Sequence, residues 1–395
     1  SLFSQWSDVT VANMSNPFSI EFFSATTGIL AGYNMGSPFP DGKIFRTTNG
    51  GTTWSQVHIM DTSSYYGSVK LNSSTAFVVG QNNYWAYIAK TTDAGATWIG
   101  TTYYSEATVL RDIQFPTPTV GYITGGSGDN VFMKSTDGGN TWNVLPLTGV
   151  DVNTHSLWFT SATTGYLSSS ENPASKIYKT TDGGNTWTEI LNSVPGTIYG
   201  MCFSTVNNGY FVTDGGHIYR TVNAGTTWTS SQPSTTVLND IFFTNTTTGY
   251  AVGLNGFGGS LILKTTDGGS NWTTDYTTSF GIGYLNEIRF TPAGAFATGN
   301  GGYVKNPSLP MSVEEFPFVE GNVFINSVSE NSEFYIRSEI ANVGGEISIY
   351  DLSGKCVLTS SMMSKIVLPS ESCGMYVAVY SGNEEVRTQK IVISR

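Results

Sequence analysis

The feature that most constrains the fold is an eight-residue motif that occurs six times along the chain. The copies are TTNGGTTW (47–54), TTDAGATW (91–98), STDGGNTW (135–142), TTDGGNTW (180–187), TVNAGTTW (221–228) and TTDGGSNW (265–272). Their third residues follow one another at intervals of 44, 44, 45, 41 and 44 residues. So regular a period indicates one structural unit per copy, with each unit stacked on its neighbours.

A second motif recurs seven times between these copies and reads as two apolar strands joined by a polar turn. Examples are IEFFSATTGILAG from residue 20 and IFFTNTTTGYAVG from residue 241. A third strand precedes each eight-residue motif, as KIYK (176–179) does, and a fourth begins at its tryptophan. Four short antiparallel strands per period of about 44 residues are typical of a β-propeller blade. The sequence therefore predicts an all-β protein.

Seven hairpins and six eight-residue motifs do not match, and the mismatch predicts how the ring closes. After the seventh hairpin, GGYVK (301–305) supplies a third strand with no motif behind it. QWSDVT (5–10) resembles the strand that follows a motif, with Trp6 in place of the tryptophan. We predict a seven-bladed propeller over residues 1–308, with its last blade completed by the N-terminal strand and with Trp6 near Tyr303. Such closure removes the open edges that a linear β array would leave.

The local chemistry of the motif favours an architectural role. Its Asp or Asn side chain can accept hydrogen bonds from its own turn, and the glycine two residues later permits a positive φ. A metal-binding or catalytic role for the carboxylates is disfavoured, because two of the six are amides. The residues expected to be structural are Asn49, Asp93, Asp137, Asp182, Asn223 and Asp267, with Trp54, Trp98, Trp142, Trp187, Trp228 and Trp272.

The pattern S/T-x-D-x-G-x-T-W resembles the Asp box, or BNR repeat, of sialidases, oligoxyloglucan hydrolases, sortilin-type receptors and the photosystem II stability factor. The resemblance implies that the boxes lie on the face opposite the binding site. Sialidases also use an arginine triad, which the four arginines of this propeller do not supply, since Arg46 and Arg220 take the basic position before a box. The oligoxyloglucan hydrolases place acid and base on two facing propellers, whereas this chain has one.

Residues that enter the first strand of each blade should converge at one mouth of the central channel. Aromatic rings with amide and acidic groups nearby suit sugar rings or a protein surface; the alternative is a solvated polar rim. An acid pair for glycoside hydrolysis across the channel is a further alternative, formed by Asp112 and Asp240. Three histidines without metal-ligand spacing predict no metal site, and no cofactor is expected. The expected binding residues are Arg111, His155, Tyr199, Asn239, Asn286, Glu287, Tyr66, Trp85 and Tyr104.

The repeat stops near residue 306, and the remaining chain reads as a linker (309–320) and a small Ig-like β-sandwich (321–395). ISIYDLSGKCVL (347–358), LPSESCGMYVAVY (368–380) and QKIVIS (389–394) resemble the C-terminal sorting domain of the type IX secretion system of Bacteroidota. The usual Y-P-N-P start is replaced by FINSVSEN (324–331). The resemblance implies export through that machinery; the alternative is an accessory module. Cleavage of the domain and a Cys356–Cys373 bridge stay open.

Charge and hydropathy exclude two classes of partner. A net charge of −11 and a pI near 4.7 argue against nucleic acid, which needs clustered Lys and Arg. No run of eighteen apolar residues is present, so no membrane span is predicted. We expect a secreted or cell-surface, non-catalytic protein that presents one loop face to a glycan or a protein. A glycoside hydrolase and a scaffold without a small ligand are the alternatives.

Overall fold

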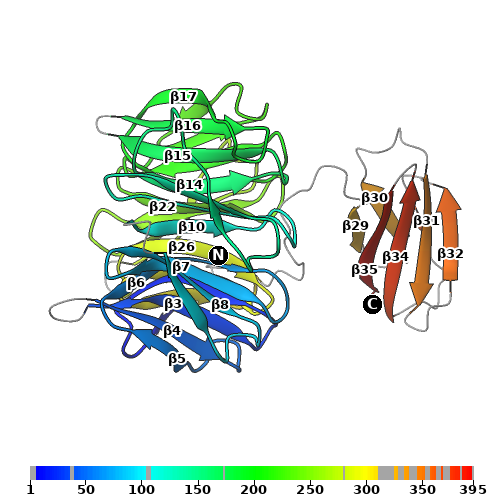
Figure 1. Cartoon of the computed structure of the whole chain (residues 1–395), viewed down its shortest axis with the longest axis horizontal. Helices are drawn as coiled ribbons and strands as arrows, with labels where there is room; N and C mark the ends of the chain where they lie inside the picture. Colours follow the sequence, from blue (N-terminus) through cyan, green and yellow to red (C-terminus); the bar gives the residue numbers. More distant parts are fainter. Residues whose placement is uncertain are drawn as a thin grey trace. The chain divides into compact units, whose positions relative to one another are not determined.

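The computed structural model describes residues 6–35, 40–103, 108–171, 174–278 and 281–309, and, beyond residue 323, the strands of a second unit. The chain divides into Ser1–Phe318 and Val319–Arg395. This division falls within the segment that the sequence assigns to the linker. Both units are built from strands (Figure 1). None of the described residues forms a helix with the length and apolar character that crossing a bilayer would take.

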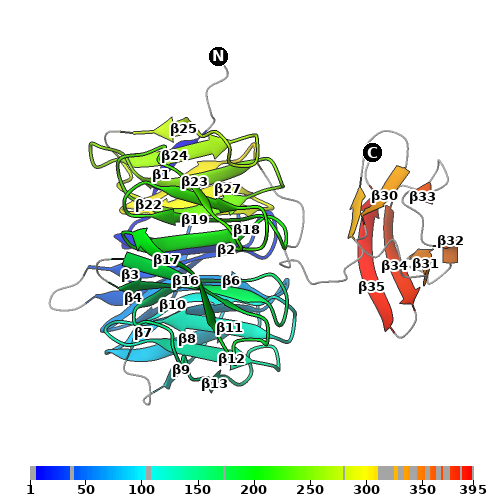
Figure 2. The same cartoon turned by 90° about the horizontal axis from the view of Figure 1, so that it is seen from above.

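The first unit is a seven-bladed propeller, as predicted, in which every blade is an antiparallel sheet of four strands. The first strand of each blade contacts the first strand of the next around the ring, and β26 contacts β2 (Figures 1 and 2). Blade 1 holds β2 (Asn16–Phe22), β3 (Gly28–Asn34), β4 (Asp41–Thr47) and β5 (Ser55–Met60), and blade 2 holds β6 (Ser63–Lys70), β7 (Ala76–Asn82), β8 (Trp85–Thr91) and β9 (Ile99–Tyr103).

The other blades repeat this order. Blade 3 holds β10 (Leu110–Gln114), β11 (Gly121–Gly125), β12 (Val131–Ser135) and β13 (Asn143–Val144), and blade 4 holds β14 (Thr154–Phe159), β15 (Gly165–Glu171), β16 (Ala174–Thr180) and β17 (Thr188–Pro195). Blade 5 holds β18 (Ile198–Phe203), β19 (Gly209–Thr213), β20 (Ile218–Thr221) and β21 (Thr229–Ser231). Blade 6 holds β22 (Leu238–Phe243), β23 (Gly249–Leu254), β24 (Ser260–Thr265) and β25 (Thr273–Thr277), and blade 7 holds β26 (Leu285–Thr291), β27 (Gly294–Gly299), β28 (Gly302–Asn306) and β1 (Ser7–Thr10).

The N-terminal strand closes the ring, as predicted. In blade 7, β1 pairs antiparallel with β28, so that Ser7 lies opposite Lys305 and Thr10 opposite Gly302. Trp6 is only 7% exposed and packs with Tyr250 of blade 6 and Phe290 of blade 7. This is the place that a box tryptophan takes between its own blade and the preceding one.

One expected neighbour of Trp6 was wrong. The tryptophan beside Tyr303 is Trp54, whose Nε1 donates to the Tyr303 hydroxyl at 3.1 Å. Tyr303 belongs to the cluster between blades 7 and 1, whereas Trp6 belongs to the cluster between blades 6 and 7. Because each of these tryptophans packs toward the preceding blade, Trp6 faces away from Tyr303.

Stacked aromatic pairs hold neighbouring blades together. The tyrosine of a second strand stacks on the phenylalanine that ends the first strand of the next blade. Ring centroids lie 3.6 Å apart for Tyr122 and Phe159, and 3.8 Å apart for Tyr210 and Phe243. Offset or parallel contacts of this kind add to the free energy of area burial. The recurring GY pair in the sequence therefore encodes a contact between blades.

Each Asp box is a closed hydrogen-bonded turn. In the box at 180–187, the Asp182 carboxylate accepts the Thr180 hydroxyl at 2.8 Å, the Thr186 amide at 2.9 Å and the Thr186 hydroxyl at 2.6 Å. Asn49 and Asn223 keep the same turn with one bond reversed, because their Nδ2 atoms donate to the following threonine hydroxyls at 2.8 and 2.9 Å. Amide and acid are thus interchangeable here, which suits an architectural role.

The boxes also join adjacent blades. The lysine before one box reaches the turn of the next, as Lys134 Nζ does when it donates to the Gly183 carbonyl at 3.0 Å. The same ammonium lies 5.4 Å from the ring centroid of Tyr122. Tyr210 donates to the Gly268 carbonyl at 3.0 Å in the same way. The basic position before each box is therefore a contact between blades.

The second unit forms two antiparallel sheets, in keeping with the predicted small sandwich. One sheet contains β29 (Phe324–Ser327), β30 (Glu333–Arg337) and β33 (Ile366–Val367). The other contains β32 (Cys356–Ser361), β31 (Gly345–Asp351), β34 (Gly374–Gly382) and β35 (Glu385–Ile393), in that order. Cys373 lies outside the described residues, so its pairing with Cys356 stays a question.

Candidate functional site

Every inner strand carries a β-bulge close to its first residue. The register shifts between Pro17 and Ser19, Tyr65 and Gly67, Leu110 and Asp112, Thr154 and Leu157, Ile198 and Gly200, Leu238 and Asp240, and Leu285 and Glu287. Bulges re-aim side chains and are common at rims and beside active sites. We call the extra residues the mouth ring: Phe18, Tyr66, Arg111, His155, Tyr199, Asn239 and Asn286.

Glycines on the second strands make room for these bulges. A Cβ atom on Gly80 would lie 2.0 Å from the Ser64 carbonyl oxygen, and one on Gly253 would lie 2.0 Å from the Val237 oxygen. These contacts are with the backbone and cannot be relieved by rotating a side chain. The small residue that ends the second hairpin strand is therefore the sequence signal for a bulge.

The mouth ring and the boxes lie at opposite ends of the strands, as the resemblance to the Asp-box family implied. The boxes bond to the turn that follows the first strand of their own blade: Gly183 N donates to the Thr163 carbonyl and Gly268 N to the Thr247 carbonyl, each at 2.8 Å. The mouth ring sits where the first strand begins. One end of the propeller is thus occupied by repeated turns, and the other carries seven side chains of five kinds.

Aromatic rings and one cation form an arc along the mouth ring over blades 1 to 5. Phe18, Tyr33 and Tyr66 pack with centroids 5.0 to 6.1 Å apart. The guanidinium carbon of Arg111 lies 6.0 Å from the Tyr66 centroid, and its Nε donates to the Gly126 carbonyl at 3.2 Å. This arc brings together four of the predicted residues: Tyr66, Arg111, His155 and Tyr199.

His155 connects Arg111 to Tyr199. Its ring meets that of Tyr199 edge to face with centroids 5.6 Å apart. Burial lowers the pKa of His155 to about 3, and the positive charge of Arg111 acts in the same direction. The imidazole is therefore neutral at physiological pH. Burial also lowers the pKa of Arg111, against the opposing effect of Tyr66 and Tyr199, but an arginine remains a cation at neutral pH.

Blades 6 and 7 contribute amides instead of rings. Asn239 Nδ2 donates to the Leu285 carbonyl at 2.7 Å, and Asn286 Nδ2 donates to the Pro17 carbonyl at 3.0 Å. Each bond joins one blade to the next. One N–H of each amide is thereby used, and the side-chain oxygen of each remains as an acceptor.

The two carboxylates of the hydrolase alternative bind the main chain of the following blade. Asp112 Oδ2 accepts Leu157 N at 2.9 Å and the Ser156 hydroxyl at 3.3 Å. Asp240 Oδ2 accepts Ile288 N at 2.9 Å. Burial raises the pKa of both groups, and these hydrogen bonds oppose the shift.

Glu287 lies just inside the mouth ring and is held in an ion pair. Its carboxylate contacts Arg289 at 2.5 Å and accepts Ile20 N at 3.1 Å, which joins blade 7 to blade 1. Arg289 also contacts Asp240 at 3.2 Å. Burial raises the pKa of Glu287 well above its usual value. Burial by itself would lower the pKa of Arg289, but Glu287, Asp240 and other acids outweigh it and raise that pKa.

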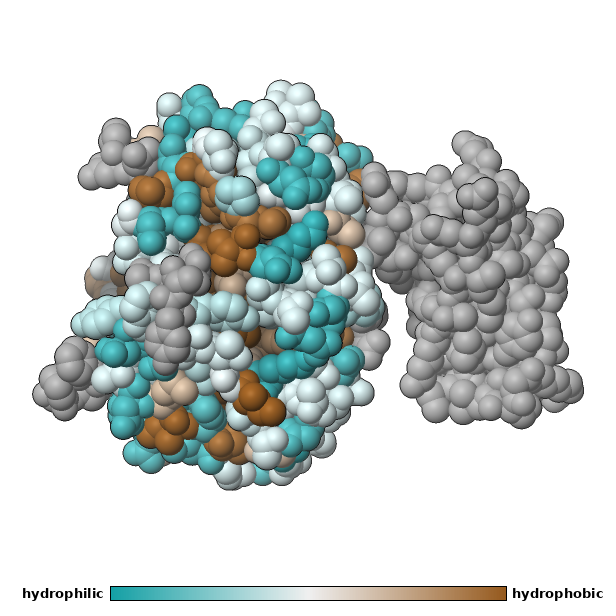
Figure 3. Space-filling view, viewed as in Figure 1, coloured by the Kyte–Doolittle hydropathy of each residue, from teal (hydrophilic) through white to brown (hydrophobic). Residues whose placement is uncertain are grey.

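The other predicted residues are less central. Trp85 begins β8 and is half-buried, and Tyr104 lies outside the described residues. Sequence reasoning missed Tyr33, which directly follows Gly32 opposite the bulge of blade 1. Figure 3 shows apolar patches separated by polar residues on the propeller, and the exposed large apolar side chains include Met35, Tyr84 and Phe257 on loops of the mouth end.

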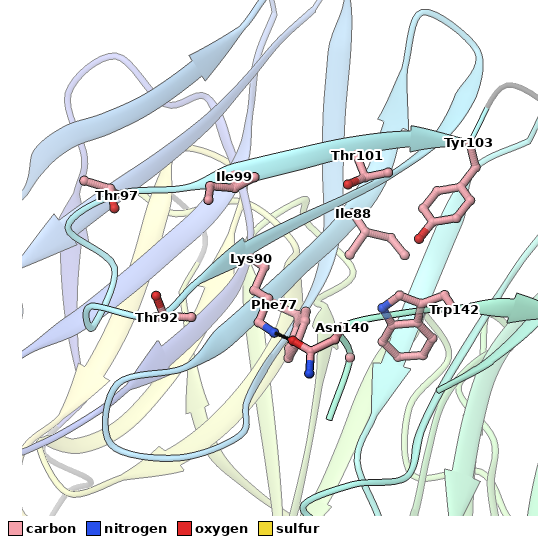
Figure 4. Close-up of a pocket in the computed structure, with 11 residues that line it drawn as sticks. Phe77, Ile88, Lys90, Thr92, Thr97, Ile99, Thr101, Tyr103, Asn140 and Trp142 are labelled. Atoms are coloured by element: carbon pink, nitrogen blue, oxygen red, sulfur yellow. Dashed lines mark hydrogen bonds between the residues drawn. The ribbon is translucent and has the colours of Figure 1, made fainter. Parts of the chain in front are cut away.

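A cavity of about 210 Å³ lies between blades 2 and 3, away from the mouth (Figure 4). Phe77, Ile88, Ile99 and Trp142 line it with box residues such as Thr92 and Asn140. Lys90 Nζ is bound there to Asn140 Oδ1 at 2.7 Å. None of the predicted binding residues that the structure describes lines this cavity. Within the described ranges, no group of three or more His, Cys, Asp or Glu side chains is placed to hold a metal ion.

Comparison with known families agrees with this architecture. Residues 101–236 match the family of the photosynthesis system II assembly factor YCF48, and residues 330–394 match the secretion system C-terminal sorting domain. The chain is a YCF48/BNR-type propeller followed by a type IX sorting domain. That domain makes it a secreted or cell-surface protein and implies contact with the secretion machinery. No curated protein matches the sequence.

Solved structures resemble the chain at low sequence identity. YCF48 bound to D1 peptide has a TM-score of 0.61 and 18% identity, covering 77% of this chain and 97% of its own. YCF48 from Cyanidioschyzon merolae has a TM-score of 0.58 and 17% identity, with 77% and 99% covered. The GH74 enzyme of Niastella koreensis has a TM-score of 0.60 and 16% identity, with 96% and 68% covered. At such identities the likeness shows the fold alone.

Proposed function

We propose that this protein is a non-catalytic binding protein, displayed or released outside the cell, whose mouth ring takes up a glycan or protein ligand. The observation that carries the proposal is the set of seven bulges. They place seven side chains of five kinds at one end of the channel, while the opposite end repeats one turn. Aromatic, cationic and amide groups converge there, as binding surfaces require.

Two further observations support binding rather than catalysis. The oxygens of Asp112 and Asp240 accept main-chain N–H groups of the next blade, a use that holds the ring together. Asp240 is also neutralised by Arg289. A similar propeller, YCF48, is described in complex with a peptide of D1, so this fold serves as a binding surface elsewhere.

Glycoside hydrolysis remains the second candidate, because one observation favours it. Burial raises the pKa of both Asp112 and Asp240, as a catalytic acid requires. If this candidate is right, incubation with a polysaccharide releases new reducing ends, and Asp112→Asn or Asp240→Asn abolishes the release. Under the binding proposal no such ends appear with the unmodified protein.

The test of the binding proposal is a screen of the purified protein on glycan and protein arrays, with product analysis of each ligand. Tyr199→Ala removes a ring that is 39% exposed at the mouth, and Val222→Ala removes a side chain that is 54% exposed on the box end. We expect Tyr199→Ala to weaken binding about tenfold or more, as loss of a central aromatic contact does. Equal losses in both variants, or none in either, would contradict the proposal.

A further inference from the structure

Arg111 differs from the other three arginines of the propeller. Arg289 is held by two carboxylates in the channel, and Arg46 and Arg220 bind the box turn of the following blade. Among the residues that the structure describes, the Arg111 side chain makes one hydrogen bond, from Nε to the Gly126 carbonyl. No carboxylate in the described part of the chain forms an ion pair with it. Its two terminal nitrogens face no such partner.

The surroundings of Arg111 make it unusual that no described carboxylate pairs with its guanidinium. The guanidinium is half-buried between Tyr66 and the neutral His155, and burial of an unpaired charge costs free energy. An arginine kept at such a cost on a binding rim is suited to an anionic group of a ligand. Its planar pair of N–H groups fits a carboxylate in two-point fashion.

Resting on the proposed function, we infer that the ligand is a glycan that contains a uronic acid, with its carboxylate on Arg111 and its ring beside Tyr199. The oxygens of Asn239 and Asn286 would accept sugar hydroxyls on the other side of the channel. Tyr199 is the exposed ring next to the cation, and flat sugar faces pack against such rings.

The charge around Arg111 favours an isolated carboxylate over a dense polyanion. The chain carries a net charge of −11. Asp61 and Asp129 are exposed on the loops of the mouth end, and a strongly charged sulfated or phosphorylated chain would be repelled by them. A single carboxylate on an otherwise neutral ring meets the Arg111 cation and avoids most of this repulsion.

Main-chain partners for a peptide are scarce at the mouth. The carbonyls of Leu285, Pro17 and Gly126 already accept bonds from Asn239, Asn286 and Arg111. Thr298 occupies the Phe18 carbonyl at 2.8 Å. A peptide that docks as an added strand relies on such main-chain groups. A sugar instead uses hydroxyls, which can pair with side-chain oxygens, and this favours the glycan over an acidic peptide.

The test measures, by calorimetry, binding of the full chain to short oligosaccharides that each carry one galacturonate, glucuronate or mannuronate among neutral sugars. Each oligomer is paired with its carboxyl-reduced, neutral counterpart. We expect at least one acidic oligomer to bind tenfold or more tightly than its neutral partner. Arg111→Gln should remove this preference and leave affinity for the neutral oligomer unchanged. Arg111→Lys, which keeps the charge without the planar pair of donors, should retain part of it.

Arg220→Gln is the matched control, because it removes an arginine from the box end; it should leave both affinities unchanged. Circular dichroism checks that each variant is folded. Equal binding of acidic and neutral oligomers, or an Arg111→Gln variant that keeps the preference, overturns the inference. So does binding of a glutamate-rich peptide with no uronate oligomer bound. Binding of neutral glycans alone would refute the inference and leave the proposed function standing. Binding of no ligand at all would refute both.

Discussion

Replacing Trp6 by alanine tests whether the N-terminal strand holds the ring closed. The indole is 7% exposed, packs with Tyr250 and Phe290, and donates from Nε1 to Asp275 at 2.8 Å. Burial of a tryptophan removes roughly 150 to 250 Å² from water, worth about 4 to 6 kcal/mol as an upper figure. Truncations of buried tryptophans cost about 3 to 5 kcal/mol. We expect a loss in that range in the free energy of unfolding.

Urea denaturation of Trp6→Ala and Trp142→Ala measures the loss and separates closure from simple core damage. Trp142 is 9% exposed and occupies the corresponding place in blade 3, so both variants lose a similar contact. Only Trp6→Ala releases a strand that lies next to β28 across the closure. Hydrogen exchange should therefore accelerate in the amides of β28 for Trp6→Ala, and in blade 3 for Trp142→Ala.

Two results would refute this reasoning. A change in unfolding free energy below about 1 kcal/mol for Trp6→Ala would mean that the indole is not a buried anchor. Unchanged protection of β28 in that variant would mean that the sheet edge is covered without the help of Trp6. Either result would mean that closure of the ring does not depend on the tryptophan that fills the box position.

Three further perturbations have defined outcomes. Hydrogen bonds from threonine lower the pKa of Asp182 to about 2. The stability that ionised Asp182 adds to the fold is therefore complete above its unfolded pKa near 4 and is lost as the pH falls through 2. Asp182→Ala should lower the melting temperature at pH 7, and Asp182→Asn should not. Gly200→Ala places a Cβ 2.6 Å from a backbone carbon of blade 6 and should lower the free energy of unfolding, measured with denaturant, by about 1 to 3 kcal/mol. In the control Gly256→Ala, the added Cβ meets nothing within 4 Å, so the free energy of unfolding should hardly change. Tyr84 and Ala94 have positive φ values of 73° and 54°, so changing either residue to glycine should stabilise the fold by about 0.5 to 1 kcal/mol. Of these two variants, only Tyr84→Gly should weaken ligand binding on an array.

The number of blades and the way they close could be predicted from the sequence because both follow from local, repeated patterns. A hydrogen-bonded turn such as the Asp box depends on residues at most six positions apart, and a period of about 44 residues repeats it in every blade. The count of seven hairpins against six boxes then left one strand to be supplied by residues 5–10. Pairing of β1 with β28 confirms that inference.

Partners of side chains across blades could not be predicted in this way. The sequence offered Asp112 only as half of the acid pair of the hydrolase alternative, yet its partner is the amide of Leu157, which lies 45 residues further on. Glu287 was expected at the binding surface, and its bond to Ile20 N spans 267 residues. Trp6 was placed beside Tyr303 because both lie in blade 7, although they face different neighbouring blades. Such contacts depend on the angle between sheets, and no local pattern encodes that angle.

The repeat itself separates architecture from function. Residues that hold the blades together recur in the same position: the box Asp or Asn, the box tryptophan, the basic residue before the box and the tyrosine that stacks on the next blade. The mouth ring occupies one fixed backbone position, the bulge, yet its seven side chains include aromatic rings, a guanidinium, an imidazole and two amides. A position whose backbone is constant and whose side chain differs from blade to blade is constrained by something other than the fold. In this propeller, departure from the repeat is therefore the reason to propose the mouth ring as the ligand site.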